Sequence, residues 1–179
     1  MADYITTYSG IHFYPTEPDV NLVKIEDVAH ALSLICRGNG HVKSFYSVGQ
    51  HCIYCAREAL ERGYSKRVAL AGLLHDAGEC YMSDVPRPFK KSLPAYVQQE
   101  ERLIELVYEH FLGSPATEEE KALVKEIDDD LLWYDLKYLL NEEMSTERPS
   151  MKIEISYDFR PFDEVEKEYL ELFNLLTNL

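Results

Sequence analysis

The chain has 179 residues, of which 46% are hydrophobic and 28% are charged, and its formal net charge is −14. These proportions are those of an ordinary globular protein, so a disordered or fibrous chain is excluded, and the length suits a single domain over residues 1–179. The negative charge would repel the phosphates of a nucleic-acid duplex, so we do not expect a duplex as the partner.

The apolar residues and the cysteines disfavour two further classes of protein. No apolar run approaches the roughly 20 residues that span a bilayer, and the N-terminus MADYITTYSG lacks the regions of a signal peptide, so we expect a cytoplasmic protein without a membrane partner. In that compartment the cysteines would be reduced. Cys52 and Cys55 form a CxxC. Because the surrounding pattern is helical and no second CxxC is present, we interpret both as small buried residues in preference to a zinc or redox motif.

The predicted elements begin with a short β-hairpin over residues 4–14, which turns at Ser9-Gly10. From Ile25 onward, apolar residues recur at helical spacing until Gly38. Further helices are predicted over residues 47–62, 66–77, 94–112, 118–140 and 163–177. Segment 141–162 lacks helical periodicity and is predicted to be an irregular excursion. The expected fold class is therefore all-α, an irregular bundle of about six main helices with its helical core over residues 25–140.

The apolar segment 70–79 carries a histidine and an aspartate side by side, His75 and Asp76. Adjacent residues on a helix point about 100° apart, so both can reach one ion only near a helix end or with the ion between their directions. Gly78 makes a helix end plausible at this point. Two ligands do not complete a metal site, so the pair requires partners elsewhere in the chain.

Two residues are suitable partners for this pair. His51 lies one predicted helix earlier and would face the same core across an antiparallel helix pair. Asp128 lies among the apolar positions 123, 124, 127 and 131, which would bury one face of their helix and draw a neighbouring carboxylate inward. Asp129 and Asp130 fit that position less well.

The order His51, His75-Asp76, Asp128 resembles the HD-domain superfamily of metal-dependent phosphohydrolases. From about residue 25 to residue 140, the spacing is similar to that of bacterial 5'-deoxynucleotidases and of related phage and bacterial deoxynucleotide phosphohydrolases. The resemblance implies an HD-domain fold in which these four side chains bind a metal ion. It also matches Glu79, Asp84 and Arg37 to further family positions, the arginine being one that contacts substrate phosphate.

Two imidazoles and two carboxylates suit one divalent ion, such as Mn, Co, Fe, Ni, Zn or Mg, with positions left for water and a phosphate oxygen. Such an ion would activate water and neutralise charge on the phosphoryl oxygens. Glu79 could orient or deprotonate that water, or be a solvated residue at a helix end. Asp84 could position the water or protonate the leaving oxygen.

Two segments rich in turn formers and positive charge, residues 37–43 and 84–91, stand out in so acidic a chain. Arg37 suits a phosphate because its donors form a planar fork, although it could instead compensate the C-terminal end of its helix. Lys43 and Lys90 would add mobile charges to the same cleft or remain solvated. His41 would contact substrate or brace its turn.

The residues that follow His75-Asp76 distinguish among the activities known in this superfamily. Cyclic-dinucleotide phosphodiesterases carry HDxGK and alarmone hydrolases HDxxED, whereas here Glu79 is followed by Cys80. Di-iron oxygenases on this scaffold need further ligands, whose spacing is not seen. We therefore expect a phosphoric ester hydrolase for a small phosphorylated metabolite, a nucleotide or deoxynucleotide with one or three phosphates. The alternative is a catalytically silent nucleotide sensor or adaptor, and in either case we expect a homodimer.

Overall fold

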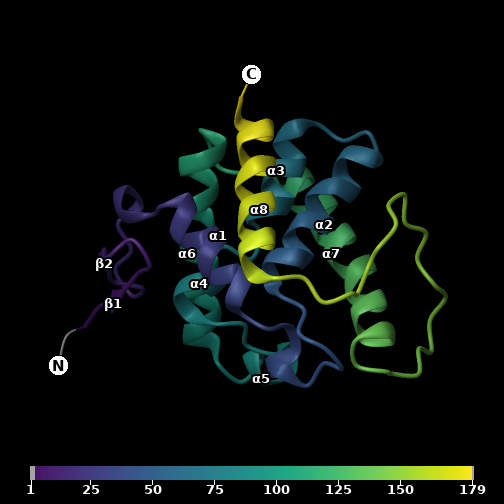
Figure 1. Ribbon diagram of the computed structural model, residues 1–179. Coiled ribbons are helices and arrows are strands. Elements are labelled where there is room, and N and C mark those ends of the chain that lie inside the picture. Colours follow the sequence, from purple (N-terminus) through teal and green to yellow (C-terminus); the bar gives the residue numbers. More distant parts are fainter. Residues whose placement is uncertain (1–2, 179) are drawn as a thin grey trace.

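The protein folds as an all-α bundle, as predicted, in a computed structural model that describes residues 3–178 (Figure 1). Its long helices are α1 (Ile25–Leu34), α2 (Val48–Glu61), α3 (Lys66–Leu74), α6 (Pro94–Leu112), α7 (Glu118–Tyr138) and α8 (Phe162–Thr177). Each predicted helix is present, with ends that differ from the predicted ends by a few residues. None of the helices within residues 3–178 combines enough length and apolarity to cross a membrane.

Shorter elements precede and join the long helices. A hairpin of two antiparallel strands lies at the start, as predicted, with Gly10 in its turn at a φ of 84° that favours glycine. The short elements are β1 (Ile5–Thr6), β2 (His12–Phe13), the 3₁₀ turns η1 (Val20–Leu22) and η2 (Arg37–Gly40), and the single-turn helices α4 (Glu79–Met82) and α5 (Arg87–Lys90). The sequence pattern did not predict α4 or α5, because a single turn is too short to show helical periodicity.

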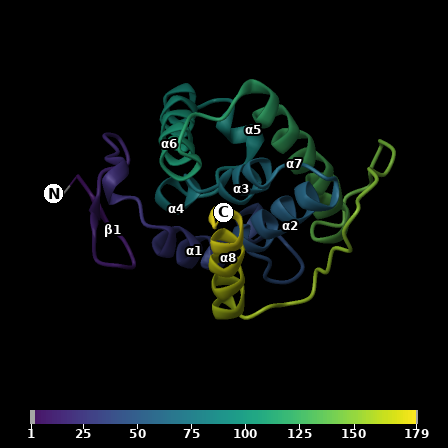
Figure 2. The same ribbon diagram turned by 90° about the horizontal axis from the view of Figure 1, so that it is seen from above.

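Helix α3 runs through the centre of the bundle. Every residue from Val68 to Leu74 is buried, because α2, α6, α7 and α8 all pack against this helix. Figure 2 shows the arrangement from above, with α8 on one side of α3 and α6 and α7 on the other. A helix that is apolar on all sides is stable in water only when other elements surround it. The residues that follow α3 therefore emerge inside the protein.

Helix α3 ends at Leu74, three residues before the predicted end. The last carbonyl groups of a helix have no partner within it, and here other groups supply the missing donors. The carbonyl of Ala71 accepts from the Tyr108 hydroxyl (3.2 Å), that of Leu73 from the Tyr169 hydroxyl (2.6 Å), and that of Leu74 from the N–H of Ala77 (2.9 Å). These tertiary contacts end the helix directly before His75, so the histidine and aspartate leave a helix end in the core.

The first turn of α2 places His51 in the interior. Ser47 and Gln50 form a capping box, in which each side chain accepts the backbone N–H of the other residue at 3.1 Å. Gly49, the second residue of α2, lies so close to α1 that a Cβ atom at this position would be only 3.3 Å from the carbonyl of Leu32. This close approach positions the start of α2, and with it His51, against α1.

The segment between α7 and α8 has no helix or strand, as predicted for residues 141–162. We call residues 141–161 the excursion. It is anchored to α2, since the buried carboxylate of Glu58 accepts the backbone N–H of Ile153 at 3.0 Å and the Tyr54 hydroxyl accepts that of Ser156 at 3.1 Å. The excursion therefore follows a fixed course beside α2 and α7 (Figure 1).

Candidate metal centre

The four side chains predicted as metal ligands lie together where α2, α7 and the end of α3 meet. Asp128 Oδ1 is 3.2 Å from Nε2 of His51 and 3.8 Å from Nε2 of His75. Asp76 Oδ2 is 3.3 Å from the same nitrogen of His75. We call these four residues the histidine-aspartate cluster. The fold thus brings together three segments that are far apart in the sequence.

The ring of His75 is held so that Nε2 faces the cluster. Nδ1 is 2.8 Å from the carbonyl oxygen of Gly72, and because a carbonyl only accepts, Nδ1 carries the proton and donates it. In the neutral ring, Nε2 therefore has a free lone pair. It is buried and has no hydrogen-bond partner in the part of the chain that the structure describes. Buried polar atoms are normally satisfied, so the position beside this nitrogen and Asp76 suits a cation.

His51 is fully buried and is supported by Asp135, which the sequence analysis did not single out. Nδ1 of His51 is 3.3 Å from Oδ2 of Asp135, on the side of the ring away from Asp128. Oδ1 of Asp135 accepts a hydrogen bond of 3.1 Å from the hydroxyl of Tyr157 in the excursion. A carboxylate behind a ligating histidine fixes the ring and raises its basicity. The missed signal was the seven-residue spacing from Asp128, which places Asp135 on the same face of α7.

The charges of the cluster favour a cation. Burial opposes a positive charge on His75, yet the nearby Asp76, two thiols and Asp128 raise its pKa well above the usual value. Burial would raise the pKa of Asp128, yet His51 and His75 hold it well below its usual range.

The distances within the cluster also suit a metal ion. Nitrogen and oxygen ligands at about 2.0–2.2 Å from one ion lie about 3–3.5 Å from one another. The three contacts of 3.2 to 3.8 Å are close to that spacing. These distances, together with the absence of a hydrogen-bond partner for Nε2 of His75 in the described chain, fit a divalent ion.

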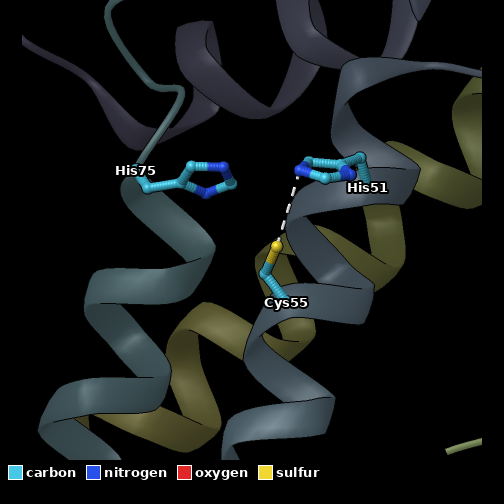
Figure 3. Close-up of side chains that lie close together, drawn as sticks. All are labelled: His51, Cys55 and His75. Carbon is cyan, nitrogen blue, oxygen red and sulfur yellow. Dashed lines mark hydrogen bonds between the residues drawn. The ribbon is translucent and has the colours of Figure 1, made fainter. Parts of the chain in front are cut away.

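Two thiols adjoin the cluster. Cys52 and Cys55 are fully buried, and all four cysteines of the chain are free thiols. Sγ of Cys55 is 3.5 Å from Nε2 of His51, as Figure 3 shows. The sulfur of Cys52 lies within 4.8 Å of ligand atoms of His75 and Asp76. The interpretation of both cysteines as packing residues is therefore incomplete, because their sulfurs face the imidazoles.

Arg37 lies at the edge of the cluster. Its guanidinium nitrogens are 3.5 Å from Asp76 Oδ2 and 3.3 Å from Asp135 Oδ2. Both contacts are long for charge-assisted hydrogen bonds, so the guanidinium keeps donors for an anion. Helix α1 ends at Leu34, and the arginine side chain turns toward the acidic residues. The structure thus brings Arg37 to the site and does not use it to compensate a helix terminus.

The two predicted catalytic carboxyl groups share an acidic environment beside Asp76. Burial, and then the charges of Asp76 and Asp84, raise the pKa of Glu79 well above its usual value. Oε2 of Glu79 is buried without a hydrogen-bond partner among residues 3–178. Burial also raises the pKa of Asp84, although Arg37 opposes the shift. Both carboxyl groups therefore favour the protonated form more than a surface carboxyl does.

Lys90 lies near these carboxyl groups, but its charge is already paired. Its Nζ is 2.7 Å from Oε1 of Glu100 in α6. It is still close enough to oppose the raised pKa of Glu79 and of Asp84. Lys90 therefore adds positive charge near the two carboxyl groups, but its ammonium group is paired with Glu100 and is not free to bind a phosphate.

The other two predicted substrate contacts lie elsewhere. Lys43 and His41 are exposed, and Lys43 donates to Asn141 at 2.9 Å. Within residues 3–178, the structure gives neither of them a contact with the cluster. Arg87, which the sequence analysis left unassigned within segment 84–91, is 2.9 Å from Oδ2 of Asp128. Loop spacing alone does not tell which cation of such a segment turns inward.

A cavity of about 430 Å³ opens between α6 and α7 beside the cluster. His75 and Asp128 lie at one end of it, and Tyr108, Lys121 and Lys125 are among the other lining residues. This volume is typical of small-ligand sites. A larger cavity of about 590 Å³ lies between α7 and the excursion and contains none of the cluster. The smaller cavity is therefore the one that gives access to the candidate centre.

No family model matches the chain. Over 108 residues, 60% of this chain and 58% of the relative, it is 38% identical to the uncharacterized protein YfdR of Escherichia coli (strain K12). Over 108 residues, 57% of this chain and 53% of the relative, it is 37% identical to the uncharacterized protein RCAP_rcc00048 of Rhodobacter capsulatus. The matches thus span a little over half the length of these relatives, and neither printed name states an activity.

Proposed function

We propose that the protein is a metal-dependent phosphoric ester hydrolase of the HD-domain superfamily, acting on a nucleotide or deoxynucleotide. The observation that carries the proposal is the series of contacts of 3.2 to 3.8 Å that links His51, Asp128, His75 and Asp76 beside a cavity. In this proposal the four side chains hold one divalent ion. When bound, such an ion acidifies water and neutralises charge on phosphoryl oxygens.

The remaining residues of the site suit proton transfer. Burial and the charges of Asp76 and Asp84 raise the pKa of Glu79, which favours a protonated carboxyl group that can donate a proton. Its unpartnered Oε2 can accept a proton from water or return one to a leaving oxygen. Asp84 lies in the same acidic environment. One carboxyl group can then accept a proton from water while the other donates a proton to the leaving oxygen.

Positive charge beside the cluster suits a phosphate group. Arg37 and Arg87 approach the cluster from different loops, and each contacts one of its carboxylates. Arginine can bind two phosphate oxygens at once, which orients the ester as well as binding it. Lys121 and Lys125 line the adjacent cavity together with Glu101 and Glu105, and Lys121 is 3.5 Å from Glu105. In so acidic a chain, Arg37 and Arg87 are therefore the cations that suit the anion.

The test is turnover of mono- and triphosphates of ribo- and deoxyribonucleosides by the purified protein with added manganese or cobalt. We expect release of phosphate or triphosphate, identified by product analysis, together with about one bound metal ion per chain. Asp128→Ala should lose both metal and turnover. The control is Asp163→Ala, an exposed aspartate of α8, which should keep both.

Two outcomes would contradict the proposal. Metal and nucleotide binding without any product would support the silent sensor instead. Turnover by an Asp128→Ala variant that contains no metal would show that the cluster is not the catalytic centre.

A further inference from the structure

We propose that Cys55 supplies a sulfur ligand to the ion held by His51 and His75, so that the centre is suited to a thiophilic divalent ion such as zinc. The inference rests on the metal centre of the proposed function. It changes the donor set, because the sequence predicted only nitrogen and oxygen ligands.

The first support is the position of Cys55 on α2. His51 and Cys55 are four residues apart, so both side chains project from the same face of the helix. This spacing lets two residues of one helix reach a common ion. Cys52 is only one residue from His51 and points about 100° away from it, so it is the less suitable of the two thiols.

The second support is distance. Sγ of Cys55 is 3.5 Å from Nε2 of His51. Nitrogen at about 2.0 Å and sulfur at about 2.3 Å from one tetrahedral ion are about 3.5 Å apart. Ligand atoms of His51, Cys55 and His75 all lie within 4.8 Å of one another. The separation of Cys55 and His51 thus matches that of two ligands of one ion, and a ligand atom of His75 is within 4.8 Å of both.

The third support is the lone pair of His75. Figure 3 shows the two imidazole rings facing each other, with the sulfur of Cys55 directed toward the ring of His51. Nε2 of His75 is buried, has no hydrogen-bond partner in the described chain, and belongs to a side chain that is only 10% exposed. A buried nitrogen, a second imidazole and a buried thiol around one point form a soft donor set, which favours zinc over magnesium.

Binding of the ion would convert the Cys55 thiol to a thiolate and release its proton to solvent. Asp128 Oδ1, 3.2 Å from Nε2 of His51, and Asp76 Oδ2, 3.3 Å from Nε2 of His75, remain available as oxygen ligands. The donor set then combines sulfur, nitrogen and oxygen, all of which are ligands of zinc in proteins.

The experiment loads metal-free, reduced full-length protein with cobalt(II) and measures bound cobalt and near-ultraviolet absorption. We expect one cobalt ion per chain and a sulfur-to-cobalt charge-transfer band. Cys55→Ser should lose the band and still bind cobalt. Cys52→Ser and Cys36→Ser are the matched controls and should keep the band. Because Cys55 is fully buried, a triple serine variant that retains only Cys55 gives an independent test and should also show the band.

The outcomes separate this inference from the proposed function. Stoichiometric cobalt without the band would overturn the sulfur ligand and leave the metal centre standing. No bound cobalt would overturn both. A band that is lost in Cys52→Ser, or in the triple variant, would show that the sulfur does not come from Cys55.

Discussion

The carboxylate of Asp135 lies 3.3 Å from Nδ1 of His51, on the opposite side of the ring from Asp128. The ring of His51 is thus held between two aspartates of the same helix, seven residues apart. One faces the candidate metal position and the other supports the ring from behind.

Replacement of Asp135 should weaken the metal centre without removing a ligand. We expect Asp135→Asn to lower metal affinity roughly 10- to 100-fold, because the ring of His51 loses its charged support. Competition with a chromophoric chelator measures this affinity. Asp130→Asn on the same helix contacts Arg62 and not His51, and its metal affinity should be unchanged. Equal affinities for wild type and Asp135→Asn would show that the contact has no role in metal binding.

Glu79 should act in the reaction and not in metal binding. Glu79→Gln should retain the metal and lower kcat by about 10²- to 10⁴-fold, because the amide cannot exchange a proton. Metal analysis beside steady-state kinetics tests both parts. Glu109→Gln, an exposed change on α6, serves as the control. A Glu79→Gln protein with normal kcat would remove this residue from the mechanism.

Arg37 should bind substrate. Arg37→Ala should raise KM about tenfold or more, which is the loss expected for a hydrogen bond to a charged group, and should leave metal content intact. The exposed Arg57 on α2 pairs with Glu168, and Arg57→Ala should leave KM unchanged. If KM were the same in wild type and Arg37→Ala, the arginine would only neutralise Asp76 and Asp135.

The hydroxyl of Tyr169 supports the end of α3. Tyr169→Phe leaves the buried carbonyl of Leu73 without a donor, and we expect a loss of about 1–3 kcal/mol in the free energy of unfolding. Urea titration followed by circular dichroism measures it. Tyr8→Phe, at a side chain that is 66% exposed, should change stability by less than about 0.5 kcal/mol. Equal losses in the two variants would contradict a specific role for this bond.

The start of α7 should make stability depend on pH. Burial raises the pKa of Glu120, but the N–H of Thr117 and the guanidinium of Arg67 together outweigh burial and lower it. A carboxyl group with a lower pKa in the folded state stabilises the fold above its unfolded pKa, and this stability is lost as the pH falls through the folded pKa. The stability difference between wild type and Glu120→Gln should therefore be largest near neutral pH and shrink from about pH 5 downward. A difference that grows on acidification would contradict this sign.

The sequence predicted the long helices well because each buries an apolar face at regular spacing. It did not predict the end of α3, since that end depends on Tyr108 and Tyr169, which come from distant helices. It anticipated the residues of the histidine-aspartate cluster from their order along the chain. It missed Asp135, whose position behind His51 becomes apparent only once α2 and α7 are packed together. It also missed Arg87, because the spacing of a loop does not show which of its cations points toward the site.

The excursion has a consequence for the exchange of parts between related proteins. Glu58 anchors its backbone, and Tyr157 near its end reaches Asp135 behind His51. A loop of another length, grafted between residues 141 and 156, would shift the tyrosine and leave Oδ1 of that aspartate without the hydroxyl group that donates to it. A chimera that takes the excursion from this protein should therefore also take Glu58 and Asp135, even though none of these parts is proposed to contact the ion.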